Sequence, residues 1–153
     1  PTYKANFNLL NFPDNGVEIS DSIQVKAMLH GHPNGANTYR LEIGDTIIVY
    51  CSDIEHPEKQ LNQNVIDFAK DADVLIKDAQ FTDEELPEHK GWGHSSWQQA
   101  TAVAEKANVK QLVLFHHNPA NNDDVIREIE KDAQVVFNNT IAAREGFEIK
   151  LPA

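Results

Sequence analysis

The first third of the chain alternates apolar and polar residues with the period of two that is typical of β-strands. Residues 3–10 predict a half-buried strand, residues 13–16 a turn, and residues 23–29 a second strand that runs into a loop at 30–35. Two further strands, 39–43 and 46–51, flank Gly44 and Asp45 and predict a tight hairpin. Because the second arm is apolar at nearly every position, we expect it to be a central strand covered on both faces.

After residue 60 the pattern changes to an alternation of helices and strands. Apolar residues recur at helical spacing in three segments, 61–69, a segment from about residue 95 to 107, and 122–132. Short apolar runs typical of strands lie at 74–76, 111–115, 134–137 and 147–150. Ser95 or Ser96 is expected to cap the middle helix. We therefore expect one α/β domain over residues 1–153, with a mixed β-sheet and no repeat or linker.

The composition limits the kinds of partner that we expect the protein to bind. The net charge of −11 disfavours extended nucleic acid, since an acidic surface repels phosphate backbones. The one cysteine, Cys51, lies in an apolar strand and is expected to be a buried, inert thiol. No apolar run approaches the ~18 residues of a membrane span, and no leader sequence is visible, so we expect no membrane association and a cytoplasmic protein. The start at Pro1 fits either a trimmed methionine or a piece of a longer chain.

Polar residues that could carry chemistry follow the ends of several predicted strands. His32, Asp53, Asp78 and His116 each come directly after an apolar run, and His94 lies at a glycine-rich helix start. Carboxyl ends of parallel strands meet at one edge of a sheet, where α/β sites form, and imidazole with carboxylate binds a divalent metal such as zinc. Such a metal activates water near neutral pH. His117, beside His116, is expected to point to the opposite side.

Structural alternatives exist for each of these residues. His32 precedes Pro33 and is typical of a surface turn, and Asp53 is equally suited to capping the turn that follows it. His94 could pack against Trp92 or Trp97. Competing catalytic motifs are missing from the sequence: there is no Gly-x-Ser-x-Gly, no Gly-x-Gly-x-x-Gly and no Walker loop. A His-x-His-x-Asp-His cluster is missing as well.

Taken together, five segments in collinear order resemble the C-terminal portion of a metallo-β-lactamase-fold hydrolase, and most closely its ribonuclease Z and cyclic-phosphodiesterase-like branch. They are His-Pro-Asn-Gly-Ala-Asn-Thr-Tyr-Arg at 32–40, Ile-Val-Tyr-Cys-Ser-Asp-Ile-Glu-His at 48–56, Leu-Ile-Lys-Asp-Ala-Gln-Phe-Thr-Asp-Glu-Glu at 75–85, Gly-Trp-Gly-His-Ser-Ser-Trp at 91–97, and Leu-Val-Leu-Phe-His-His-Asn-Pro at 112–119. The resemblance implies an αββα sandwich of two similar halves, of which this chain supplies about one.

The resemblance also implies roles for the five residues. His32 and His116 resemble metal ligands, and Asp53 resembles the carboxylate that bridges two metals. His94 resembles the histidine that assists at the scissile phosphate, and Asp78 a carboxylate that orients a neighbour. The implied metal is zinc, with manganese or iron as alternatives, in a site that is incomplete in this chain because the family's remaining ligands come from the His-x-His-x-Asp-His segment.

The implied activity is hydrolysis of a phosphodiester or another ester by a metal-bound hydroxide, on a small-molecule or compact substrate, provided that the ligand cluster is supplied elsewhere. The alternative is a non-catalytic regulatory or interaction module that keeps the fold without a complete metal site. We expect the chain to pair with the N-terminal half of the same fold or with a second copy of itself, because half of a sandwich leaves one sheet face bare.

Overall fold

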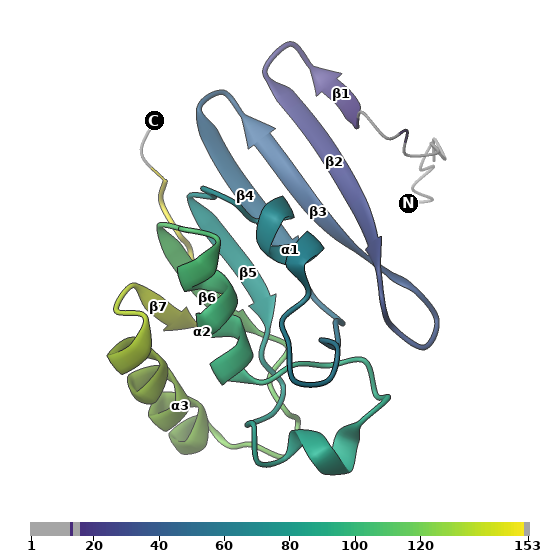
Figure 1. The fold of residues 1–153 in the computed structure, drawn as a ribbon. Helices are drawn as coiled ribbons and strands as arrows, with labels where there is room; N and C mark the ends of the chain where they lie inside the picture. The colour runs from purple at the N-terminus through teal and green to yellow at the C-terminus, as the bar shows by residue number, and fades with distance from the viewer. Residues whose placement is uncertain (1–12, 14–15, 152–153) are drawn as a thin grey trace, which may run out of the picture.

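A mixed β-sheet, with strand order β1-β2-β3-β4-β5-β6-β7, forms the centre of the protein (Figure 1). This computed structural model describes residue 13 and residues 16–151. The antiparallel part comprises β1 (Val17–Ser20), β2 (Ile23–His30), β3 (Ala36–Ile43) and β4 (Thr46–Cys51). Strands β5 (Val74–Asp78), β6 (Gln111–Phe115) and β7 (Thr140–Ala142) continue the sheet from β4 in parallel. The α/β class and the mixed sheet predicted from the sequence are confirmed.

The antiparallel strands follow the alternation in the sequence. The predicted hairpin is present, with Ile43 opposite Thr46 and Gly44 in the left-handed conformation at a φ of 57° that the tight turn requires. The strand predicted at 23–29 is β2, whereas β1 was not predicted. The strand predicted at 3–10 lies outside the described residues, as do two of the four residues of the turn predicted at 13–16.

Helices cross over between the parallel strands. They are α1 (Gln63–Phe68), the short 3-10 helix η1 (Leu86–His89), α2 (Trp97–Lys106) and α3 (Asp123–Val136). Ser96 rather than Ser95 caps α2, in a reciprocal capping box with Gln99. Asn122 caps α3, and Asp123 and Asp124 occupy its first turn, where the helix dipole favours carboxylates. Among the described residues, none of the helices has the length and apolarity needed to traverse a lipid bilayer.

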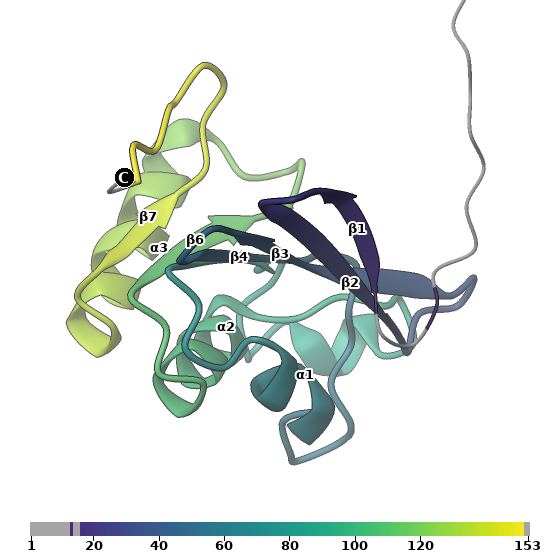
Figure 2. The same cartoon turned by 90° about the horizontal axis from the view of Figure 1, so that it is seen from above.

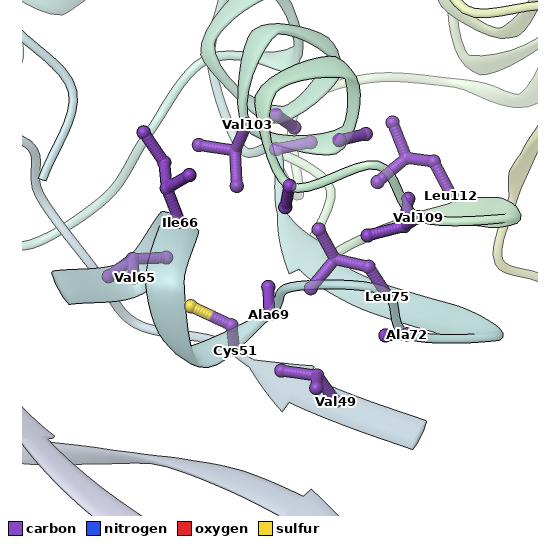
Figure 3. Close-up of a cluster of buried hydrophobic side chains, with 14 of the residues drawn as sticks. Val49, Cys51, Val65, Ile66, Ala69, Ala72, Leu75, Val103, Val109 and Leu112 are labelled. Atoms are coloured by element: carbon purple, nitrogen blue, oxygen red, sulfur yellow. The ribbon is translucent and has the colours of Figure 1, made fainter. Parts of the chain in front are cut away.

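The hydrophobic core lies between one face of the sheet and helices α1 and α2. Figure 3 shows Val49, Cys51, Leu75 and Leu112 of the sheet facing side chains of both helices. All four side chains are fully buried, and Cys51 is the buried free thiol that the sequence predicts. Burial of this kind stabilises the fold by about 1.5–3 kcal/mol for each large apolar side chain.

The opposite face of the sheet is not covered by a helix in the described part of the chain over β2, β3 and β4 (Figure 2). Strand alternation places Ile48, Tyr50 and Phe115 on this open face, and all three are only half-buried. Leu29 and Ile43, which share the face by the register of β2 with β3, are 74% and 39% exposed. The prediction that β4 is covered on both faces is therefore wrong for this chain by itself, because the helices shield one face.

The C-terminal strands predicted at 134–137 and 147–150 are wrong. Residues 134–136 form the end of α3, and residues 147–150 have no regular secondary structure. The buried stripe of α3 runs through Ile129, Ala133 and Phe137, four residues apart, while Val135 is 87% exposed. The strand was predicted because Val135, an apolar residue on the solvent side of the helix, extended the apolar run. The strand that closes the sheet is instead β7, which pairs with β6.

Candidate functional site

The four strand-end residues predicted from the sequence lie at one edge of the sheet. Asp78 is the last residue of β5, His116 follows β6 directly, and Asp53 and His32 come two residues after β4 and β2. Asp53 and His116 have positive φ values of 57° and 58°. Non-glycine residues rarely adopt this backbone conformation, and such strain is concentrated at functional sites, so the two turns deserve a functional explanation.

The side chains of these residues approach one another closely. Nε2 of His116 lies 3.4 Å from Oδ1 of Asp53. His32, Asp53 and His94 each offer one ligand atom, and the three atoms lie within 4.8 Å of one another. Asp78, His94 and His116 form a second group by the same measure. The two groups share His94, so that all five residues selected from the sequence belong to one continuous cluster.

His94 is at the centre of this cluster. Its ring stacks on that of His116 with ring centres 4.7 Å apart, and it meets the ring of His32 edge-on at 6.0 Å. Nδ1 of His94 lies 2.9 Å from Oδ2 of Asp78. The hydrogen bond with Asp78 raises the pKa of His94, against the smaller opposing effect of burial. His94 is therefore an imidazole whose ring is oriented by a buried carboxylate.

Asp78 is fully buried, and its neighbours satisfy both of its carboxylate oxygens. Oδ1 accepts a hydrogen bond from the backbone N–H of Ser95 at 3.0 Å, and Oδ2 accepts one from the backbone N–H of Asp53 at 3.0 Å. Burial opposes ionisation, but the bonds from His94 and Ser95 and the nearby charge of Lys77 outweigh it and hold the pKa of Asp78 below its ordinary value. Asp78 is thus a buried carboxylate that stays ionised at neutral pH.

A loop that the sequence analysis treated only as a motif fixes His32. The carboxylate of Glu55 accepts hydrogen bonds from the backbone N–H groups of Gly91 and Gly93 at 2.9 and 3.0 Å. Gly93 has a φ of 90°, and a Cβ atom built on it would lie 2.2 Å from Cδ2 of His32. Only glycine lets the loop pass this close to the imidazole, so Gly93 and Glu55 together form one wall of the site.

Three residues of this environment were not selected from the sequence: Glu55, Lys77 and Ser95. Glu55 acts across 36–38 positions of the chain, a separation at which spacing carries no signal. Lys77 had a signal, since a lysine inside the buried run of β5 is unusual, and its side chain is fully buried. His117, by contrast, lies outside both ligand groups of the described residues. It lines one cavity with Asn118 and Arg144 and another together with His116.

The donor set fits a divalent metal. Imidazole nitrogens and a carboxylate oxygen are the ligands that zinc prefers among oxygen and nitrogen donors. Nδ1 of His116 is buried without a hydrogen-bond partner while Nε2 faces Asp53. Beside His94 lies a cavity of about 290 Å³, lined by His56, Lys59, Leu86, His89 and Lys90 among others. The arrangement combines metal-type donors, a buried carboxylate–imidazole pair and adjacent space.

The fold and this cluster define a domain of the metallo-β-lactamase class, in which strand ends supply histidine and aspartate. A family model described as "Beta-lactamase superfamily domain" matches residues 6–117, and the chain belongs to this family. The family-level resemblance inferred from the sequence is therefore confirmed.

Three comparisons relate the chain to individual proteins. It is 43% identical over 83 residues to the ribonuclease Z of Gemmatimonas aurantiaca, covering 54% of this chain and 26% of the relative. The metallo-β-lactamase fold protein YhfI of Bacillus subtilis superposes with a TM-score of 0.77 at 23% identity, over 95% of this chain and 57% of that one. The short form of human tRNase Z superposes with a TM-score of 0.67 at 19% identity, over 92% and 48%.

The chain thus spans about a quarter of the length of the ribonuclease Z it matches, and about half of each solved structure. At this level of identity the two structural comparisons establish the fold, namely part of a metallo-β-lactamase fold.

Proposed function

We propose that this chain is the C-terminal half of a metal-dependent hydrolase that cleaves a phosphodiester or another ester. The observation that carries the proposal is the contact of Asp78 with His94, beside Asp53 and His116 at the same sheet edge. The family membership and the ribonuclease Z relatives support hydrolysis, and the acidic charge of −11 supports a small or compact substrate over long RNA.

His32, Asp53 and His116 would hold the metal, which we propose to be zinc, with manganese or iron as alternatives. When bound there, the ion supplies Lewis acidity and an activated water. Asp53 is exposed enough, at 39% of its side chain, to be reached from the side of the missing sandwich half. Further ligands would come from that half, since these 153 residues contain no His-x-His-x-Asp-His cluster.

His94 and Asp78 would handle the proton. Asp78 accepts the hydrogen bond of Nδ1, which fixes the ring and leaves Nε2 for the substrate. As water attacks phosphorus or the carbonyl carbon, the bond to the leaving oxygen breaks. Nε2 of His94 gives its proton to that oxygen. A proton from the attacking water then re-protonates Nε2. The hydrogen bond with Asp78 raises the pKa of His94, which favours the protonated form of the ring.

We also propose a cytoplasmic location, with which the single free cysteine, Cys51, is compatible.

The test uses the longest native gene product that contains these residues. We expect it to bind zinc and to hydrolyse bis(p-nitrophenyl) phosphate. His116→Ala should abolish both, whereas His117→Ala, the adjacent histidine outside both ligand groups, should leave both unchanged. Zinc binding without hydrolysis of any phosphodiester or carboxylic ester would contradict the enzymatic proposal.

The second candidate is a non-catalytic regulatory or interaction module. The incomplete ligand set of this chain favours this module, because a domain can keep its fold when the ligands of its metal site are lost. Metal content discriminates the two: a native gene product that carries no metal after purification, and gains none from added zinc, would make the module the better description.

A further inference from the structure

Lys77 is a charged side chain in the middle of the core. It lies on the face of β5 that carries Leu75, opposite Leu114 of β6 in the sheet register, and its exposed fraction is 0%. Lysine is almost never fully buried unless it is paired, because removal of an ammonium from water is costly. Nζ of Lys77 lies 2.7 Å from Oγ of Ser95, which is also fully buried. Packing alone does not require a lysine at this position, since leucine occupies the neighbouring positions.

The charge of Lys77 has one anionic neighbour among the buried groups that influence it. Burial raises the pKa of the Cys51 thiol, so that this neighbour stays neutral. Burial, reinforced by Lys77, lowers the pKa of His56 to about 3, so that this imidazole is also neutral at pH 7. Asp78 remains, as the buried carboxylate that stays ionised. Burial lowers the pKa of Lys77 itself, and the charge of Asp78 opposes this shift. The amine and the carboxylate thus lie on adjacent residues of one strand, with Ser95 between them.

The direction of the hydrogen bonds through Ser95 is fixed. Nζ of Lys77 donates to Oγ of Ser95, so Oγ accepts this bond and has its own proton left to give. That proton points to Asp78, whose main-chain oxygen lies 2.9 Å and whose Oδ1 lies 3.3 Å from Oγ. The backbone N–H of Ser95 adds the bond to Oδ1. Ser95 thus holds one side of the Asp78 carboxylate while His94 binds the other.

We propose that Lys77 is a positioning residue for the Asp78–His94 pair and acts through the hydroxyl of Ser95. The inference rests on the proposed function, in which His94 protonates the leaving group. With Lys77 in place the Ser95 hydroxyl is oriented toward Asp78, the carboxylate is held in one rotamer, and Oδ2 faces Nδ1 of His94. Without Lys77 the hydroxyl is free to turn, and both the carboxylate and the ring lose their fixed orientation.

The kinetic test compares two leaving groups. Lys77→Met and Ser95→Ala are made in the zinc-loaded native gene product, with Lys106→Met on the exposed side of α2 as the matched control. A p-nitrophenyl phosphodiester leaves without protonation, whereas a diester with an alkyl alcohol leaving group needs a proton from His94. We expect kcat for the alkyl diester to fall roughly tenfold to a hundredfold in both variants, a share of what a positioned general acid contributes. In both variants, kcat for the p-nitrophenyl diester and the zinc content should stay unchanged. The Lys106→Met control should match the wild type in all of these measurements.

A second readout does not depend on catalysis. In nuclear magnetic resonance spectra, the hydrogen-bonded Nδ1–H proton of His94 should be visible in the wild-type protein. Its exchange with solvent should be at least about tenfold faster in both variants, since a mobile carboxylate protects it less. Ser95→Ala removes only a hydroxyl, so this variant still tests the positioning role if Lys77→Met fails to fold. Unchanged Nδ1–H exchange, or equal losses on both substrates, would overturn the positioning role. An inactive wild type with the Nδ1–H effect intact would instead count against the proposed function.

Discussion

The backbone N–H of Asp53 donates a hydrogen bond to Oδ2 of Asp78, the oxygen that also contacts Nδ1 of His94. This bond joins the turn after β4 to the end of β5, so the position of a candidate metal ligand depends on the carboxylate that orients the candidate proton donor. Because Asp53 has a strained φ of 57°, its turn needs such an external support. Removal of this Asp78 oxygen is therefore expected to damage both the metal-binding and the proton-transfer parts of the site.

Asp78→Asn tests this coupling. The amide has the shape of the carboxylate, but its NH₂ group cannot accept a bond from His94 or from Asp53, and a buried donor is left unpaired. We expect the free energy of unfolding to fall by about 1–3 kcal/mol, hydrolysis to drop roughly a hundredfold or more, and zinc affinity to fall as well. Urea denaturation, kinetics and zinc titration measure the three effects. A variant that loses activity with full zinc affinity would show that the Asp53 turn is independent.

Gly93→Ala should damage the site more than Gly91→Ala. Both glycines have a left-handed backbone, with φ values of 90° and 84°, and both donate their N–H to Glu55. Alanine at 91 has open space and should cost only the backbone strain, about 1–2 kcal/mol. Alanine at 93 would push against His32, so it should also weaken zinc binding. Calorimetric titration with zinc compares the pair, and equal zinc affinities would exclude Gly93 as a support for His32.

The convergence of the strand-end residues could be predicted from the sequence for a physical reason. Asp53, Asp78 and His116 are each a polar residue after an apolar run, and parallel strands then bring their ends to one edge. The role of Lys77 could not be predicted because it depends on which face of β5 the core covers. The role of Ser95 could not be predicted because its partner is 18 positions away. Glu55 makes contacts with a loop whose path no local pattern encodes.

The wrong secondary-structure predictions have the same cause, namely contacts between segments that no local pattern encodes. The Gly44–Asp45 turn is a local signal, and the hairpin around it was predicted correctly. Residues 134–137 contain three apolar side chains, and the packing of Ala133 on the sheet side of α3, a tertiary effect, decides that they continue a helix. Strand β7 is only three residues long and is defined by its pairing with β6 rather than by its own composition.

Asp73 should make the stability of the fold depend on acidity. It accepts hydrogen bonds from Nζ of Lys110 at 2.6 Å and from the backbone N–H of Ile47 at 2.7 Å, and the first of these contributes most to a pKa below the ordinary value of 3.8. A carboxyl with a depressed folded-state pKa stabilises the protein above its unfolded-state pKa, and this contribution is lost as the pH falls through the folded-state value.

The Asp73→Asn variant should therefore be less stable than the wild type by about 1–2 kcal/mol at pH 7, and the difference should shrink below pH 3.8. Asp21→Asn in the exposed turn between β1 and β2 serves as the control. Urea denaturation at several pH values measures the effect, and a difference that is independent of pH would assign the stabilisation to something other than ionised Asp73.

Zinc stoichiometry should reveal an incomplete site. His32, Asp53 and His116 suffice for one ion with water in the remaining positions, whereas a tight two-metal site needs ligands from outside these residues. We expect the isolated chain to take up at most one zinc ion, weakly, and Asp53→Asn to remove it while Asp45→Asn in the exposed hairpin turn does not. Two tightly held ions, counted by native mass spectrometry of the 153-residue chain, would refute the requirement for a second half.

The open face of the sheet leads to the last prediction. Ile48, Tyr50 and Phe115 are half-buried on this face, Tyr50 meets the ring of Phe115 at 5.7 Å, and Leu29 is 74% exposed. Val113 of β6 shares this face and is buried in this chain by itself, as is Leu75 on the core face, whereas Ile48, Tyr50 and Phe115 are not. Several apolar side chains left partly or largely exposed on one sheet face are typical of a surface that a partner covers.

We therefore expect the face to be covered by the other half of the sandwich, and the chain without that half to self-associate. Sedimentation in dilute solution should give a mass above 17.2 kDa for the isolated chain, and Leu29→Lys with Ile43→Lys should shift it toward the monomer. Val135→Lys, which changes a still more exposed apolar residue on α3, should not. A stable wild-type monomer that binds no apolar dye would mean that the open face needs no partner, and the non-catalytic module would then describe the chain better than half of a hydrolase.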